Sequence, residues 1–141
     1  MKYRVIKQFT FEAAHRLYEN YQGKCTNNHG HSWQIALHLE ADELDNKGMV
    51  IDFTEMKKLK EWIDNELDHT TILSSTDPMV DYIKDSKQRL FVVTGNPTSE
   101  AIGRVIFEKA VEFFTNDHVK VAKVEIAETC TSMAQIINDK L

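Results

Sequence analysis

Histidines at three closely spaced positions are the residues of this sequence best suited to chemistry. His29-Gly30-His31 places two imidazoles on one side of an extended chain, because side chains alternate along a strand. His15 follows Phe11 at even spacing, so it can point the same way. Three neutral imidazoles leave the fourth position of a tetrahedral zinc ion open, which is typical of a catalytic site. The alternative is that a His-x-His pair arises by chance and binds nothing.

Cys25 lies four residues before His29 and admits three interpretations. A lone cysteine is often a buried small hydrophobe. Beside a zinc ion its thiolate is favoured, and it would then serve as a base or a nucleophile. It could instead be a fourth zinc ligand, which would make the site structural.

Two further features have acid/base or binding potential. Asp68 next to His69 can orient the imidazole and hold its proton, whereas an equally good interpretation is that His69 caps a helix and interacts with its dipole. Glu128 ends a strand, where a carboxylate is usually solvated. It could accept two parallel hydrogen bonds from the N–C–N edge of a pterin or a guanine. We interpret His38 and His118 as surface or satisfied core residues.

The alternation of apolar and polar residues predicts the strands that position these side chains. Residues 3–12 and 31–41 both alternate and are predicted strands. Residues 45–48, Asp-Asn-Lys-Gly, indicate a turn. Residues 49–51 are then predicted to begin a short third strand, in a hairpin with a long loop.

Two helices are predicted from apolar positions at helical spacing. Asp52 has the spacing to Glu55 that opens a helix, which is expected over 53–67. Residues 70–88 are predicted to be a loop with at most a short helix. After a brief strand at 89–93, Thr98 can cap a second helix that ends at Asn116-Asp117.

The last part of the chain completes an α+β fold. Residues 119–128 predict a strand whose apolar phase changes along its length, which indicates a bulge. Residues 133–137 predict an edge strand. The order of elements predicts an antiparallel sheet with two helices on one face. The other face would meet water or another subunit.

The composition of the chain limits the classes of protein to which it can belong. The chain has 141 residues, 42% of them hydrophobic and 28% charged, which predicts one globular domain over 1–141. The net charge of −5 argues against non-specific nucleic-acid binding. No apolar run approaches the ~18 residues that cross a bilayer, and two cysteines do not make a disulfide scaffold. We therefore expect a cytoplasmic protein with no nucleic-acid or membrane partner.

Seven stretches together resemble the 6-pyruvoyl-tetrahydropterin synthase / 6-carboxy-tetrahydropterin synthase family. Each stretch alone is weak evidence for the family, but the seven occur in the family's order and span nearly the whole chain. The stretches are Phe11-Glu12-Ala13-Ala14-His15, Gly23-Lys24-Cys25, His29-Gly30-His31, Gly48-Met49-Val50-Ile51-Asp52-Phe53, Leu67-Asp68-His69, Pro97-Thr98-Ser99-Glu100 and Glu128-Thr129.

The resemblance implies a fold, a metal and an assembly. His15, His29 and His31 match the family's three zinc ligands. The implied fold is the tunnelling fold, in which subunits join into barrels, commonly as a hexamer made of two trimers with sites at subunit interfaces. Such an assembly would explain the uncovered sheet face.

The resemblance also implies catalytic and substrate-binding roles. Cys25 matches the catalytic thiol, and Asp68 with His69 matches a second acid/base pair. Glu128 matches the glutamate that anchors the pterin ring, with Thr98 nearby in the same role.

The interval between Cys25 and His29 resembles the 6-carboxy-tetrahydropterin synthases of the queuosine pathway. The implied reaction converts 7,8-dihydroneopterin triphosphate and water into 6-carboxy-5,6,7,8-tetrahydropterin, acetaldehyde and triphosphate. The first alternative is triphosphate elimination without carbon–carbon cleavage, which gives 6-pyruvoyl-tetrahydropterin. The second, of another class, is a non-catalytic zinc module with Cys25 as the fourth ligand.

Overall fold

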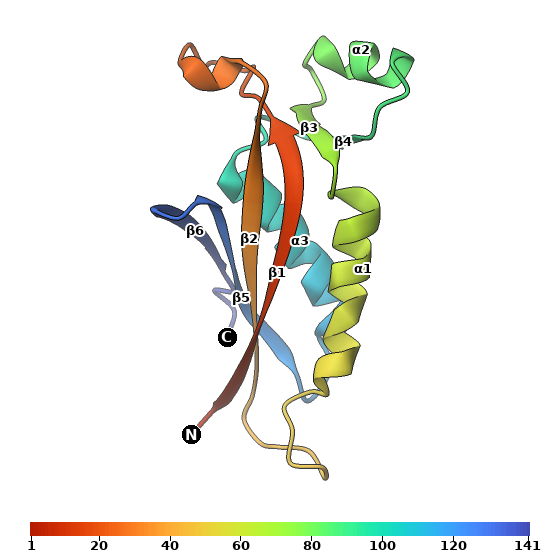
Figure 1. The fold of residues 1–141 in the computed structure, drawn as a ribbon. Helices are drawn as coiled ribbons and strands as arrows, with labels where there is room; N and C mark the ends of the chain where they lie inside the picture. Colours follow the sequence, from red (N-terminus) through yellow and green to blue (C-terminus); the bar gives the residue numbers. More distant parts are fainter.

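The computed structural model describes residues 1–141 as a curved six-stranded sheet with helices against one face (Figure 1). The strand order is β4-β3-β1-β2-β5-β6. The strands are β1 (Tyr3–His15), β2 (His29–Ala41), β3 (Thr70–Ser74), β4 (Leu90–Val93), β5 (Lys120–Thr129) and β6 (Ser132–Ile137). The helices are the α-helices α1 (Lys57–Glu66), α2 (Met79–Asp85) and α3 (Ser99–Phe114) and the 3₁₀ helices η1 (Lys24–Thr26) and η2 (Phe53–Met56).

A long antiparallel hairpin of β1 and β2 forms the centre of the sheet. Its register runs from Tyr3 opposite Ala41 to His15 opposite His29. Odd-numbered residues such as Trp33 are buried on the helix side, and even-numbered residues face the other way. The strands predicted over 3–12 and 31–41 are confirmed, and each extends further toward the segment that connects them.

The predicted bulge in the strand at 119–128 is confirmed. Opposite β2, the register shifts between His38 and Leu39, so Ala122 is the extra residue on β5. The bulge changes the phase of β5 and keeps Val121 and Val124 in the core. The edge strand predicted at 133–137 is β6.

The predicted third strand at 49–51 is wrong. The Asp45 carboxylate accepts hydrogen bonds from the backbone amides of Lys47 and Met49, and Gly48 has a φ of 79°. This tight turn directs Val50 into the core as part of an irregular segment. A strand here could not pair with β2, because both edges of β2 are already occupied by β1 and β5.

The expectation of a loop over 70–88 is wrong in its first part and correct in its second. Residues 70–74 form β3, which pairs in parallel with the end of β1 and with β4. Only three residues of β3 pair with β1, so the local pattern carried little signal. The sheet is therefore mixed, antiparallel over β1, β2, β5 and β6. The short helix is α2, and the strand predicted at 89–93 is β4.

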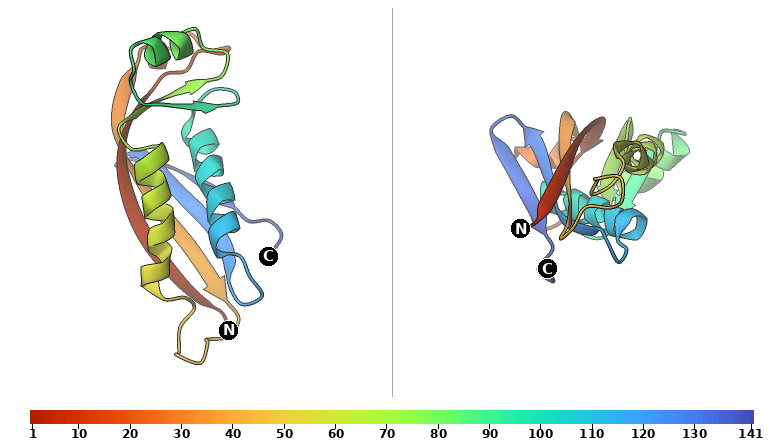
Figure 2. Two further views of the ribbon diagram at one scale, coloured as in Figure 1. Left: turned by 90° about the vertical axis from the view of Figure 1, so that its right-hand side faces the viewer. Right: turned by 90° about the horizontal axis from the view of Figure 1, so that it is seen from below.

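Helices α1 and α3 lie side by side against the concave face of the sheet (Figure 2). The Asp52 side chain caps η2, which leads into α1, and the Thr98 hydroxyl caps α3 by accepting from the Ala101 amide at 3.1 Å. Between helices and sheet lies a cluster of 23 buried apolar residues. The predicted α+β class, with two helices on one face, is confirmed. No helix is both long enough and apolar enough to span a membrane.

Gly103 lies where α3 packs tightly against strands β5 and β6. A Cβ built there would overlap the side chain of Ile136 and lie 2.9 Å from Cγ2 of Ile126. We predict that Gly103→Ala lowers the free energy of unfolding by about 1 kcal/mol or more. Overpacking, which costs about 1 to 3 kcal/mol, outweighs the ~1 kcal/mol gain in helix propensity.

The measurement for Gly103→Ala is urea unfolding followed by circular dichroism. The matched variant is Gly103→Ala with Ile136→Val, which removes the Cδ1 atom that would overlap and should recover part of the loss. A stabilised Gly103→Ala protein would contradict the predicted close packing.

Candidate metal centre

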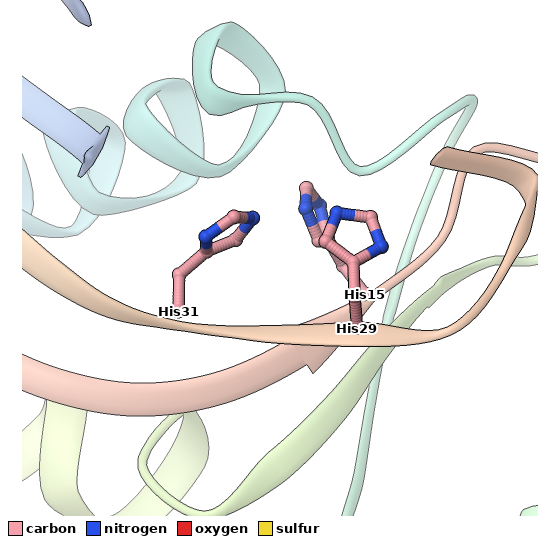
Figure 3. Close-up of side chains that lie close together, drawn as sticks. All are labelled: His15, His29 and His31. Atoms are coloured by element: carbon pink, nitrogen blue, oxygen red, sulfur yellow. The ribbon is translucent and has the colours of Figure 1, made fainter. Parts of the chain in front are cut away.

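His15, His29 and His31 meet at the end of the β1–β2 hairpin where segment 16–28 connects the two strands (Figure 3). His15 is the last residue of β1 and lies opposite His29, the first residue of β2. Alternation brings His31 to the same face. One potential ligand nitrogen from each ring lies within 4.8 Å of those of the other two. The predicted three-imidazole cluster is thus brought together by the fold.

Backbone carbonyls orient two of the three rings. Nδ1 of His15 donates to the Pro97 carbonyl at 2.7 Å, and Nδ1 of His29 donates to the Asn27 carbonyl at 2.7 Å. Because a carbonyl can only accept, these bonds place the proton on Nδ1 and leave a lone pair on Nε2. This is the arrangement found for metal-bound histidine, whose second nitrogen donates to an outer partner.

The free nitrogens of the cluster fit a metal ion. Nε2 of His15 and Nε2 of His31 are buried and have no hydrogen-bond partner in the protein. A buried polar atom without a partner is costly, so a ligand that satisfies both atoms would bind favourably. Burial lowers the pKa of His15, which outweighs the hydrogen bond to Pro97 and the nearby Glu128 charge that raise it. This lowered pKa favours the neutral imidazole, which is the form that binds a metal.

The buried ring of Trp33 lies beneath the histidine cluster, on its core side. This ring is completely buried and meets the rings of His15 and His31 edge to face, with centroids 5.0 and 5.3 Å away. Its Nε1 donates to the Ala13 carbonyl at 3.1 Å. The indole thus packs against two of the three imidazoles from the side of the core.

Glu128 lies beside the cluster at the end of β5. One carboxylate oxygen is 3.6 Å from Nε2 of His31, and the other accepts a hydrogen bond from the Ser99 hydroxyl at 2.7 Å. Glu128 and Ser99 line a hollow of about 260 Å³ between the start of α3 and the β5–β6 turn. Thr98, next to this hollow in sequence, uses its hydroxyl as the helix cap. Sequence reasoning assigned Ser99 no role, although its position directly after the cap was an available signal.

Cys25 lies in η1, within the segment that joins the two ligand strands. The Cys25 carbonyl accepts a hydrogen bond from the Leu17 amide at 2.8 Å. Because Leu17 is only two residues after His15 in the sequence, this bond brings the Cys25 backbone back toward the end of β1. The thiol is half-buried and free of any disulfide. The ligand atoms that lie within 4.8 Å of one another come from the three histidines and do not include the Cys25 sulfur.

Asp68 and His69 form a hydrogen-bonded pair directly after α1. Nδ1 of His69 donates to Asp68 at 2.7 Å, and the other Asp68 oxygen accepts from the Glu12 amide at 2.8 Å. Burial alone would raise the pKa of Asp68, but these two hydrogen bonds and nearby positive charge bring it below its ordinary value. The imidazole of His69 is 74% exposed. The predicted pair is thus formed, with its ring presented to the surroundings.

Asp68 and His69 do not belong to the group of ligand atoms that lie within 4.8 Å of one another. His69 lines a hollow of about 350 Å³ that reaches His31 and is otherwise bounded by Glu12, Ala14 and Ser32 among its walls. These even-numbered strand residues alternate with the ligands, so the hollow opens on the opposite face of the sheet. Sequence order gave no indication of this separation.

One arginine and one further histidine have structural partners. Arg16, which directly follows His15, forms a two-bond ion pair with the buried Asp77, with N–O distances of 2.7 and 2.5 Å. His38 is buried on β2 and pairs with Glu125 on β5, in agreement with the interpretation of a core residue.

Comparison with known proteins gives relatives over the full length. Residues 4–139 match the family model described as 6-pyruvoyl tetrahydropterin synthase. A 6-carboxy-5,6,7,8-tetrahydropterin synthase from Aquifex aeolicus is 32% identical, with 96% of this chain and 98% of that protein covered. The protein of that name from Synechocystis is 35% identical, with 97% and 95% covered.

Solved structures share the fold. An uncharacterized protein from Wolinella succinogenes has a TM-score of 0.86 at 27% identity, with 99% of both chains covered. The 6-pyruvoyl tetrahydropterin synthase from Caenorhabditis elegans has a TM-score of 0.73 at 27% identity, with 99% of this chain and 97% of that one covered. The architecture is therefore the tunnelling fold that the resemblance implied. Together, the family model and the two curated relatives show that this chain is an enzyme of the 6-pyruvoyl tetrahydropterin synthase family.

Proposed function

We propose that this protein is a zinc-dependent 6-carboxy-5,6,7,8-tetrahydropterin synthase. It converts 7,8-dihydroneopterin triphosphate and water into 6-carboxy-5,6,7,8-tetrahydropterin, acetaldehyde and triphosphate, as a step toward queuosine. The observation that carries the proposal is the cluster of three imidazoles with unpartnered nitrogens next to the Glu128 carboxylate. The names of the relatives at 32% and 35% identity support the carboxy product.

His15, His29 and His31 would hold the zinc ion, because three neutral imidazoles suit zinc and leave one position open. When bound, the ion supplies Lewis acidity that lowers the pKa of the substrate's side-chain hydroxyls. The absence of the Cys25 sulfur from the ligand group supports an open site over a closed structural one.

Glu128 would anchor the pterin ring. A carboxylate can accept two parallel hydrogen bonds from an N–C–N donor edge. The Ser99 hydroxyl orients Glu128 at 2.7 Å, and the cap at Thr98 fixes the start of the helix beside it. The ring would then occupy the hollow at Glu128 and direct its side chain toward the histidines.

Cys25 would act as the base that removes a carbon-bound proton next to the ring, and His69 would return or relay a proton. Asp68 supports this role for His69 because it holds the Nδ1 proton at 2.7 Å. Since His69 lies on the opposite face of its own sheet, the pair that completes each site would come from a neighbouring subunit.

An assembly of subunits into a barrel, as a hexamer of two trimers, is supported by the edges of the sheet. β1 pairs with β3 only over Ala13–His15, so its earlier residues have one edge without a strand partner. β6 ends the sheet on the opposite side of β1 and has one edge without a strand partner. Ile6, Met133 and Ile137 are 51%, 60% and 63% exposed. Pairing β6 of one copy with β1 of the next would satisfy both edges and cover these side chains. The two free cysteines suit the reducing cytoplasm.

The first alternative remains 6-pyruvoyl-tetrahydropterin formation, which the name of the family model and of the Caenorhabditis elegans relative favours. Product analysis separates the two reactions. We expect the purified zinc-loaded protein to release acetaldehyde and a 6-carboxy product from 7,8-dihydroneopterin triphosphate, measured by mass spectrometry. A pyruvoyl product without acetaldehyde would replace the first proposal by the second, and no turnover would reject both.

The metal assignment is tested by two substitutions. His29→Ala should lower zinc affinity by about a hundredfold or more, since even an outer-shell change costs ten- to a hundredfold. Cys25→Ala should keep its zinc and lose turnover. Zinc content by elemental analysis is the measurement, and His118→Ala is the control because that histidine lies outside the cluster.

The same measurements judge the non-catalytic alternative. If Cys25 were a fourth ligand, Cys25→Ala would lose metal, and X-ray absorption would detect a sulfur at about 2.3 Å from zinc. Either result would rule out the open site.

The shared site is tested by mixing two inactive variants. Cys25→Ala removes the thiol from every site, and His69→Ala removes the imidazole that a neighbouring subunit contributes to it. In mixed oligomers some sites combine the intact Cys25 of one subunit with the intact His69 of its neighbour. Random assembly of equal amounts should restore about a quarter of the wild-type sites. Activity is measured after subunit exchange, with each variant alone as control. A mixture as inactive as its components would show that each site lies within one chain.

A further inference from the structure

The segment 16–28 connects the two ligand strands and contains Cys25. Apart from the three residues of η1, it has no regular secondary structure. Its position therefore depends on individual hydrogen bonds to other parts of the molecule. If Cys25 is to meet a substrate held at the histidines, these bonds must set its distance from them.

Asn96 makes three of these bonds through its side-chain amide. Its Oδ1 accepts from the backbone amides of Tyr18 and Glu19, at 2.9 and 2.8 Å. Its Nδ2 donates to the Glu19 carbonyl at 2.7 Å. The amide thus binds both N–H groups and a carbonyl of the short stretch Tyr18–Glu19, which determines the position and the orientation of that stretch.

The turn that contains Asn96 also supports the metal cluster. The next residue, Pro97, accepts the hydrogen bond from Nδ1 of His15. Thr98 follows as the cap of α3, and its amide donates back to the Asn96 carbonyl at 2.9 Å. Residues 96–98 therefore contact the Cys25 segment, a metal ligand and the helix next to Glu128.

Other contacts of the segment lead elsewhere. The Glu19 carboxylate accepts from the hydroxyls of Ser74 and Thr76, and Arg16 pairs with Asp77. These bonds attach the segment to the end of β3 and the start of α2. Asn96, in contrast, attaches it to the turn that orients His15.

We propose that Asn96 is a positioning residue, which sets the Cys25 segment relative to the metal ligands through its three bonds to Tyr18 and Glu19. The proposal rests on the proposed function, in which Cys25 acts on a substrate held at the cluster. Asn96 itself touches neither metal nor substrate. Its loss should change where the thiol lies while leaving the three imidazoles in place.

The test uses Asn96→Ala and Asn96→Asp in a Cys130→Ser background, where Cys25 is the remaining thiol. Aspartate keeps the two acceptor bonds and replaces the donor to the Glu19 carbonyl with a repulsive oxygen. The matched control is Asn116→Ala. Asn116 likewise accepts from two backbone amides, those of His118 and Val119, but it lies at the far end of α3.

Four quantities are measured: zinc content, melting temperature, the rate of Cys25 alkylation by iodoacetamide, and kcat with KM. For Asn96→Ala we expect retained zinc, an alkylation rate changed about threefold or more, and kcat lowered about tenfold or more with KM little changed. Small displacements of a catalytic group cost factors of this size. Asn96→Asp should lie between Ala and wild type. The Asn116→Ala control should alter melting temperature alone.

The proposal is overturned if Asn96→Ala matches Asn116→Ala in alkylation rate and in kcat. It is also overturned if both Asn96 variants lose zinc, because the residue would then support the ligands and not the thiol. Should the wild-type protein fail to turn over the pterin, the proposed function falls, and the zinc content and alkylation rate still judge the role of Asn96.

Discussion

The register of β1 against β2 is the constraint on which the site depends. Pairing His15 with His29 and Ala13 with His31 brings imidazoles from two strands to one face. A slip of one residue would move the side chains of one strand to the other face. The buried odd-numbered residues prevent such a slip, above all Trp33, whose indole donates to the Ala13 carbonyl. The alternation that builds the core therefore also aims the ligands.

The cluster is left unsatisfied by the protein itself. Buried nitrogens without partners cost about 1 to 3 kcal/mol each, and two of them belong to His15 and His31. The carbonyls of Pro97 and Asn27 occupy the opposite ring nitrogens of His15 and His29 and prevent these rings from using Nδ1 instead. The folded chain thus holds a set of nitrogen lone pairs that a bound cation would satisfy.

The candidate functional groups are distributed over the two faces of the sheet. Histidines and Glu128 lie on the helix side, whereas the Asp68–His69 pair opens on the uncovered side. A curved sheet with two open edges offers a way to unite them, since neighbouring copies can present one face to the other's edge. In this proposal the catalytic site is complete only when the subunits assemble.

Local patterns in the sequence determined a large part of this protein. Alternation predicted β1 and β2, helical spacing predicted α1 and α3, and the order of the motifs identified the family. These features depend on neighbours within a few residues, so they can be read from the chain directly. The candidate ligands followed because His15 and the His29–His31 pair end and begin adjacent strands.

The tertiary structure alone decided the rest. β3 exists because the end of β1 offers it a partner, and 49–51 is irregular because β2 has no free edge left. The side of the sheet on which His69 lies depends on contacts between residues far apart in sequence, as do the three bonds of Asn96 to a segment 77 and 78 positions away. Such pairings depend on which surfaces the folded chain brings together, and no local pattern contains that information.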